Sequence, residues 1–338
     1  RKIMNKKRVL AMLLAGAMAL SMTACGGNSA STDGSSNDGG ASASGGSYKV
    51  SVILKTLAAE YWPYVKSGAE AYASEHSDKV TVEVKGPSSE TAFDEMQNMI
   101  ETDLSSGSYD GIVISPLQSD TAAQLVSGTK LPIVAIDTNF TAPEVKSFVG
   151  TGNEAAAKKG GEAAVEAAKA AGWTDIKCIE IAGVQGDQTN TARMNGYKAG
   201  VEEAGGTFLS DEVQYADATA DRATTAMEAI MQTHPEGIAI ICANNDDMAM
   251  AAARAAQGHD AYKNTIFLGF NGDRAACEAI LAGQMTMSVA QMAYEMGYKA
   301  VETMVQVLDG ETVDEFVDSG SDVVTPDNAQ ERLDTLKT

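Results

Sequence analysis

From Tyr48 onward, short apolar runs alternate with longer segments whose apolar residues recur at helical spacing. Such runs are typical of strands buried on both faces, and their alternation with helices predicts parallel sheets covered by helices on both sides. We expect strands at residues 49–54, 80–84, 111–115, 132–136, 177–182, 208–214, 237–242, 265–270 and 286–290. We expect helices at residues 64–74, 90–104, 121–127, 154–170, 191–204, 222–232, 246–257 and 275–282.

This pattern occurs twice, with a glycine-rich break at Gly150-Thr151-Gly152. The break lacks both a third glycine in register and a Gly-Lys-Ser/Thr sequence, so it favours a hinge over a phosphate loop. The fold class expected is therefore α/β, with two doubly wound parallel-sheet lobes joined by a hinge.

The N-terminal segment is typical of an export signal. Lys6, Lys7 and Arg8 precede the apolar run 9–22, which is too short to span a bilayer comfortably. Residues 20–25 end in Cys25 and look like the site that bacterial lipoproteins acylate, although an ordinary signal peptide with an incidental cysteine would share the features. We predict a signal peptide over residues 1–24 and a lipid-anchored flexible linker over residues 25–47, rich in Gly, Ser, Ala, Asn and Asp. The expected location is extracytoplasmic, anchored to the cell membrane through lipidated Cys25.

Charge and cysteine usage exclude several classes of function. The formal net charge is −21, which argues against binding to nucleic acid or anionic lipid through bulk electrostatics. Cys178, Cys242 and Cys277 show neither a Cys-x-x-Cys nor a metal-ligand spacing, and buried free thiols are expected. The sequence shows no catalytic triad, zinc or cofactor motif, so we expect neither an enzyme nor a bound cofactor or metal.

Polar and aromatic residues follow the predicted strands. In doubly wound sheets, ligands bind beyond the carboxyl ends of the strands. Carboxylates accept hydrogen bonds from paired hydroxyls, cationic side chains donate to oxygens, and aromatic rings cover apolar faces, which together suit a small polyhydroxylated ligand. The candidate binding residues are Lys55, Tyr61, Trp62, Asp137, Thr138, Asp187, Arg193, Asn245, Asn271 and Gln291.

Several of these residues have a structural alternative. Asp137 is also suited to a turn or a helix cap, and Asp246 is better suited to capping its helix than to touching a ligand. One of Tyr61 and Trp62 is expected in the core. Because the chain is acidic, Arg193 could instead form an ion pair with an acidic residue on the surface.

Short stretches carry a family resemblance over nearly the whole body of the chain. They are residues 132–137, 193–197, 244–249, 269–272 and 289–291, in this order. With them the chain resembles the type I periplasmic sugar-binding proteins of ABC importers, near the ribose- and arabinose-binding members. The resemblance implies that Asp137, Arg193, Asn245 and Gln291 contact a monosaccharide, and that Tyr61 or Trp62 stacks on it.

The resemblance also implies a mechanism and an organisation. The lobes would close on the sugar about a multi-strand hinge, with crossings near residues 151–152 and 291–292 and a third near residues 319–320. A membrane permease would receive the sugar from a monomeric binding protein. The lobes would comprise residues 48–151 plus 292–320 and residues 152–291 plus 321–338.

The identity of the sugar is left open by the sequence. Lys55 and Asn271 stand where ribose binders carry serine and aspartate, and both residues match the arabinose type. Arabinose binders also carry a glutamate after the lysine. In this chain Ala59 occupies that position, and Glu60 is next to it. An arabinose-, galactose- or ribose-like aldose is expected. Two alternatives are a receptor for the furanosyl autoinducer, which Lys55, Asp137 and the pair 187–188 would fit, and a sugar sensor that feeds a membrane signalling protein.

Overall fold

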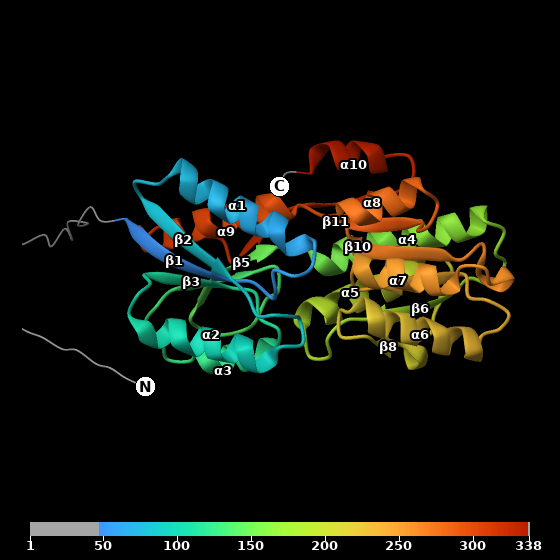
Figure 1. The fold of residues 1–338 in the computed structure, drawn as a ribbon, viewed down its shortest axis with the longest axis horizontal. Helices are drawn as coiled ribbons and strands as arrows, with labels where there is room; N and C mark the ends of the chain where they lie inside the picture. Colours follow the sequence, from blue (N-terminus) through green and yellow to red (C-terminus); the bar gives the residue numbers. More distant parts are fainter. Residues whose placement is uncertain (1–46, 337–338) are drawn as a thin grey trace, which may run out of the picture. The chain divides into compact units, whose positions relative to one another are not determined.

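The computed structural model describes residues 47–336, which form two parallel-sheet lobes (Figure 1). The predicted signal peptide, Cys25 and the linker up to residue 46 lie outside the described residues. Within residues 47–336, no helix has both the length and the apolar character needed to cross a membrane.

The first lobe is built on a six-stranded parallel sheet with the order β12-β5-β4-β3-β1-β2. Its strands are β1 (Tyr48–Ile53), β2 (Val80–Lys85), β3 (Gly111–Ile114), β4 (Ile133–Ile136), β5 (Val145–Gly150) and β12 (Phe316–Asp318). Its helices are α1 (Tyr61–Glu75), α2 (Phe93–Ser106), α3 (Ser119–Val126) and α9 (Ala293–Leu308). Helices α1 and α9 pack on one face of this sheet, and α2 and α3 pack on the other (Figure 1).

Helices α1 and α9 approach each other backbone to backbone. A Cβ atom at Gly68 would collide with the carbonyl of Tyr294, and one at Gly297 would collide with the carbonyl of Val65. The two glycines are therefore required where the helices cross. This close approach fixes α9, which comes late in the chain, against the first helix of the lobe.

The second lobe is built on a seven-stranded sheet with the order β13-β11-β10-β9-β6-β7, with β8 also paired to β6. Its strands are β6 (Lys177–Ala182), β7 (Thr207–Phe208), β8 (Gln214–Tyr215), β9 (Ile240–Ala243), β10 (Ile266–Asn271), β11 (Met287–Gln291) and β13 (Ser321–Val324). Its helices are α4 (Asn153–Ala170), α5 (Gln188–Glu203), α6 (Ala220–Thr233), α7 (Asp246–Ala256), α8 (Arg274–Leu281) and α10 (Ala329–Thr335), with short 3-10 turns η1 (Ser210–Glu212) and η2 (Asp260–Tyr262).

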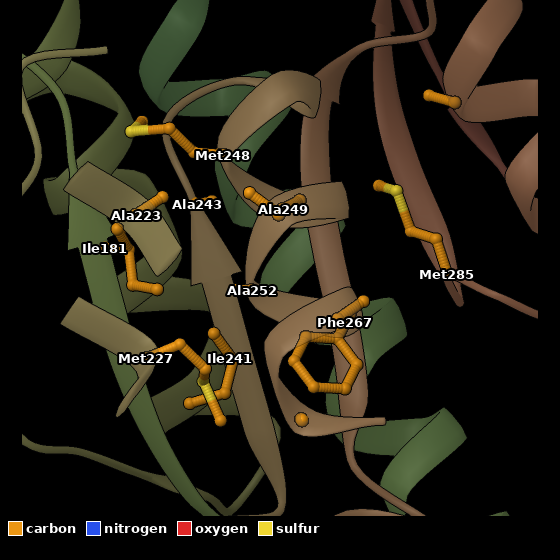
Figure 2. Packing of buried hydrophobic residues seen from close by; sticks show 14 of the residues in the cluster. Ile181, Ala223, Met227, Ile241, Ala243, Met248, Ala249, Ala252, Phe267 and Met285 are labelled. Carbon is orange, nitrogen blue, oxygen red and sulfur yellow. The ribbon is translucent and has the colours of Figure 1, made fainter. Parts of the chain in front are cut away.

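The second sheet also has a core on each face. Helices α4 and α5 cover one face, while α6, α7 and α8 cover the other with a cluster rich in alanine, isoleucine and methionine (Figure 2). Cys178, Cys242 and Cys277 are buried in these clusters. Helices on both faces of two largely parallel sheets confirm the predicted doubly wound α/β fold class.

The chain passes between the lobes at three places. It crosses between β5 and α4, again at Met292 between β11 and α9, and finally between β12 and β13. Strand β13 pairs antiparallel with β11, so the second sheet is not purely parallel. The three crossings place the carboxyl ends of the strands of one lobe opposite those of the other.

The structure differs from the predicted elements in several places. The prediction ended at residue 290, so it did not include α9, β12, β13 or α10. Strand β5 was not expected, because Lys146 and Ser147 interrupt its apolar pattern, and it pairs between β4 and the three-residue edge strand β12. The single strand expected over residues 208–214 is instead two short strands separated by η1. The polar run Ser210-Asp211-Glu212 favours that turn over a continuous strand.

Candidate functional site

A polar cavity of about 510 Å³, its open mouth included, lies between the two lobes. Nine of the ten predicted site residues line it, whereas Thr138 does not. The lining residues are Lys55, Ala59, Tyr61, Trp62, Glu90, Asp137, Val184, Asp187, Thr189, Arg193, Ala218, Asn244, Asn245, Asp247, Asn271, Asp273 and Gln291. The cavity therefore collects side chains from the ends of strands in both sheets, where doubly wound proteins bind ligands.

A buried ion pair joins the lobes across this cavity. Lys55 follows β1 in the first lobe, and its ammonium contacts the carboxylate of Asp187 in the second. The two side chains are 7% and 4% exposed. Burial alone would lower the pKa of Lys55, but the carboxylates of Asp187, Asp137 and Glu90 outweigh it and raise that pKa. Lys55 is thus held as a cation.

Asp187 is also the N-cap residue of helix α5. Its Oδ1 accepts a hydrogen bond from the backbone N–H of Asn190 at 3.1 Å, as a helix N-cap does. This cap fixes the carboxylate in place, so one oxygen serves the helix and the other serves Lys55.

Asp137 occupies a left-handed backbone conformation, with φ 62°, directly after β4. Its carboxylate accepts hydrogen bonds from the Tyr61 hydroxyl at 3.0 Å and from the Thr138 Oγ1 at 2.9 Å. The hydroxyl of Thr189, from the second lobe, donates to the Asp137 carbonyl at 3.2 Å. Asp137 is thus a turn residue that also faces the cavity, while fully buried Thr138 holds the carboxylate from behind.

The two aromatic residues at the start of α1 both line the cavity. Their rings meet edge to face, with centroids 5.0 Å apart. Burial and the neighbouring Asp137 carboxylate raise the pKa of Tyr61 well above its ordinary value, so its hydroxyl remains a donor. The indole Nε1 of Trp62 donates to Glu90 at 3.0 Å. Both residues also pack in the hydrophobic core of the first lobe, so each of them is a core residue as well as part of the cavity wall.

Arg193 is held by neutral groups and an aromatic ring. Its Nε donates to Asn153 Oδ1 at 2.8 Å, and its Nη1 donates to the Asn244 carbonyl at 2.7 Å. The guanidinium carbon lies 3.8 Å from the centroid of the Phe270 ring. Arg193 is buried in the cavity wall, so the alternative of a surface ion pair is wrong.

A chain of hydrogen bonds links the cavity to two of the crossings. Gln291 Nε2 donates to Asn271 Oδ1 at 2.9 Å, and the Thr151 hydroxyl donates to Gln291 Oε1 at 2.8 Å. Asn271 Nδ2 in turn donates to Asp273 Oδ2 at 3.1 Å. The Gln291 amide, and through it that of Asn271, is therefore oriented by Thr151 at the first crossing.

Asn245, not Asp246, caps helix α7. Asn245 Oδ1 accepts from the N–H of Met248 at 2.9 Å, while its Nδ2 donates to the Ala218 carbonyl at 3.0 Å. Asp246 is fully buried and accepts from Ser288 Oγ at 2.6 Å and from the N–H of Asp273 at 3.0 Å. The expected capping role of Asp246 is thus wrong, and this residue instead ties α7 to Ser288 near the start of β11 and to Asp273 just after β10.

Sequence reasoning missed several lining residues, of which Glu90 and Asp273 are the most buried carboxylates. Burial raises the pKa of Glu90, and burial together with the Asp246 carboxylate raises the pKa of Asp273. Glu90 follows β2. The candidate residues were found by reading forward from the carboxyl ends of the predicted strands, and Glu90 was missed because the end of β2 was not included. Asp273 lies only two residues beyond Asn271.

The charged lining residues are five carboxyl groups and two cations. The carboxyl groups belong to Glu90, Asp137, Asp187, Asp247 and Asp273, and the cations are Lys55 and Arg193. This excess of acceptors disfavours an anionic ligand and favours an uncharged ligand with many hydroxyl donors. Within residues 47–336, no group of three or more His, Cys, Asp or Glu side chains is arranged to hold a metal ion.

Two doubly wound lobes, three crossings and a polar cavity between strand ends define a two-lobed binding protein. The chain belongs to the periplasmic binding protein domain family, whose model matches residues 50–312. It is 27% identical over 268 residues to the ribose import binding protein RbsB of Escherichia coli K12, covering 78% of this chain and 86% of that protein. It is 30% identical to the D-allose-binding periplasmic protein of the same organism, covering 75% of this chain and 82% of that protein.

The fold similarity extends to solved structures. One is a carbohydrate transporter solute-binding protein from Agrobacterium radiobacter in complex with D-arabinose. It superposes with a TM-score of 0.77 at 24% identity and covers 86% of this chain and 98% of its own.

Proposed function

We propose that this protein is the solute-binding component of an ABC sugar importer, which captures an uncharged monosaccharide between its lobes and delivers it to a membrane permease. The observation that carries the proposal is the convergence of Lys55, Asp137, Arg193, Asn271 and Gln291, from both lobes, on one cavity. The relatives named for ribose and D-allose support the same class of ligand.

The lining chemistry suits an aldose. The Asp137 carboxylate would accept from a pair of hydroxyls, and Lys55 and Arg193 would donate to hydroxyl or ring oxygens. Tyr61 and Trp62 would cover the C–H face of the ring. The amides of Asn245, Asn271 and Gln291 both donate and accept, which allows them to match hydroxyls of either orientation.

Capture would occur by closure of the lobes, comprising residues 48–151 plus 292–320 and residues 152–291 plus 321–338. The sugar would bind the lobe that bears Lys55 and Asp137 and draw the second lobe onto its other face. Closure can be favoured only by as much as the ligand's differential affinity for the closed form. We also propose that the protein is a monomer, is held at the membrane by lipidated Cys25, and catalyses no reaction.

A furanosyl autoinducer is a second candidate ligand, because Lys55, Asp137 and Asp187 all line the cavity. Gln188, which should complete that signature, is exposed and lies outside the lining, which weakens the candidate. A role as a sugar sensor for a membrane signalling protein would use the same cavity.

The test is a binding screen of the chain from residue 46 onward, which forms one compact unit. Thermal shift followed by calorimetry would compare D-ribose, D-allose, L-arabinose, D-galactose, D-fucose, D-xylose and the autoinducer, with Asp137→Asn as the control for the site. A ligand that binds the native state raises the melting temperature by mass action. A shift with an aldose, lost in Asp137→Asn, supports the proposal. A shift with the autoinducer alone, or with none of these compounds, overturns it.

A further inference from the structure

Helix α8 begins without a cap from its own lobe. Its N-cap residue, Asp273, makes no side-chain hydrogen bond to the first turn of the helix. The Asp273 carboxylate instead accepts from Asn271 Nδ2 and lines the cavity. The first N–H groups of a helix have no partner within the helix and need an acceptor from elsewhere.

Glu60 of the first lobe supplies that acceptor. The N–H of Arg274 donates to Glu60 Oε1 at 3.1 Å, and the N–H of Ala275 donates to Glu60 Oε2 at 3.2 Å. Both carboxylate oxygens therefore bind backbone of the opposite lobe. The hydroxyl of Tyr64, one helical turn further along, donates to Oε1 at 2.8 Å and orients the carboxylate.

Glu60 binds the first N–H groups of α8 but does not line the cavity. Its neighbours Ala59 and Tyr61 line the cavity, whereas Glu60 itself does not. The carboxylates of Asp247 and Asp273 lie near enough to Glu60 for its charge to raise their pKa values, although burial is the larger cause. This like-charge repulsion opposes the contact, and the positive end of the α8 dipole offsets it.

We infer that Glu60 is a positioning residue that caps helix α8 from across the cleft, an inference that rests on the proposed capture of a sugar by closure. The cap has two consequences. It leaves the Asp273 carboxylate available to the ligand, because the helix does not need it. It also adds two hydrogen bonds that exist only while the lobes are together, so Glu60 slows release of the ligand and not its capture.

The kinetic test compares Glu60→Ala and Glu60→Gln with the wild type by stopped flow with D-ribose, D-allose, L-arabinose and D-fucose. It follows tryptophan fluorescence, since Trp62, one of the two tryptophans of the chain, lines the cavity. A helix cap contributes ~1 kcal/mol, so the dissociation rate should rise about fivefold in Glu60→Ala. The association rate should stay within about twofold. Glu60→Gln should lie between the two proteins, because its amide oxygen still accepts one bond.

Two further variants separate the cap from a general loss of charge. Tyr64→Phe removes the hydroxyl that orients Glu60 and should raise the dissociation rate by a smaller factor. Glu101→Ala removes an exposed acid of α2 on the same lobe and should change neither rate. An unchanged dissociation rate in Glu60→Ala, or a change confined to association, overturns the inference.

Amide hydrogen exchange on the sugar-saturated proteins provides a second readout, because the lobes are then held together. A peptide that contains Arg274 and Ala275 should exchange faster in Glu60→Ala than in the wild type, and peptides from α2 should exchange equally. If none of the four sugars binds, the proposed function fails, and with it the closure on which the cap rests. If a sugar binds and exchange at α8 is equal in the two sugar-bound proteins, the proposed function stands and the cap alone is overturned.

Discussion

Replacement of Lys55 by methionine would remove the charge of the cross-lobe ion pair and keep most of the length of the side chain. Asp187 would then be buried in the closed form without its cation, close to the carboxylates of Asp137 and Glu90 that also act on Lys55. Removal of one partner from a buried pair costs about 3–5 kcal/mol. At the lower end of this range, sugar affinity would fall about 150-fold.

The effect on the ligand-free protein should be smaller. When the lobes separate, Asp187 is exposed to water and its charge no longer needs a partner. The free energy of unfolding of the ligand-free protein should therefore fall by much less than the free energy of sugar binding, and the melting temperature should change little. Isothermal titration calorimetry and thermal unfolding on the same samples would measure both quantities.

The matched control for Lys55→Met is Lys66→Met. Lys66 forms an exposed pair with Glu70 one turn along α1, at 3.6 Å. Pairs of this kind contribute only about 0.3–0.5 kcal/mol, so binding should be unaffected. A loss in Lys55→Met of less than tenfold would show that the closed form does not depend on this pair.

A double-mutant cycle with Asp187→Asn would isolate the interaction between the two side chains. Asparagine can still cap helix α5, so the substitution removes the charge and keeps the cap. If the penalty in Lys55→Met comes from the unpaired carboxylate, the double variant should bind more tightly than Lys55→Met alone.

Three further predictions concern the site and the core. Asp137→Ala should abolish sugar binding and also lower the free energy of unfolding by ~1 kcal/mol, because alanine is strained at φ 62°. Asp137→Asn should also lose binding, but with less strain. Calorimetry would measure the binding of both variants, and thermal melting followed by circular dichroism would measure their stability. D-galacturonate should show no measurable affinity where D-galactose binds, because five carboxyl groups line the cavity; comparable affinities in calorimetry would contradict this. Burial raises the pKa of Glu180 to about 8, so this group costs ~1.4 kcal/mol of stability for each pH unit from about 4.5 up to about 8. Glu180→Gln should therefore raise the melting temperature at pH 8 and leave it unchanged at pH 4.5.

The sequence was sufficient for the fold class because most strands are buried on both faces. Continuous apolar runs such as residues 111–114 and 133–136 identify such strands without reference to tertiary context. Strand β5 lacked this signal, since Lys146 is exposed near the edge of the sheet, and its pairing with β12 depends on residues more than 160 positions later. Strand β5 is therefore defined by its partners β4 and β12 and not by its own apolar pattern.

The candidate site could be located from the sequence, but its internal bonds could not. Counting forward from each strand end found Asp137 and Gln291, and it would have found Glu90. The same rule gave no means to place Thr138 behind Asp137, or to assign the cap of α7 to Asn245 in place of Asp246. These assignments depend on backbone geometry over one or two residues and on a second element, such as the Ser288 hydroxyl that engages Asp246.

The late position of α9 in the chain has a consequence for how the protein folds. Ala293, Met296, Val301 and Met304 of this helix fill the core between α1 and the first sheet, although that sheet otherwise comes almost entirely from residues before 151. A nascent chain that ends before residue 293 would expose the apolar face of α1 and of three central strands. The first lobe should therefore remain incomplete until nearly the whole chain is available, and a truncation before residue 293 should destabilise the N-terminal lobe as well as removing β13 and α10 from the second. Contacts of such long sequence separation also predict slow folding.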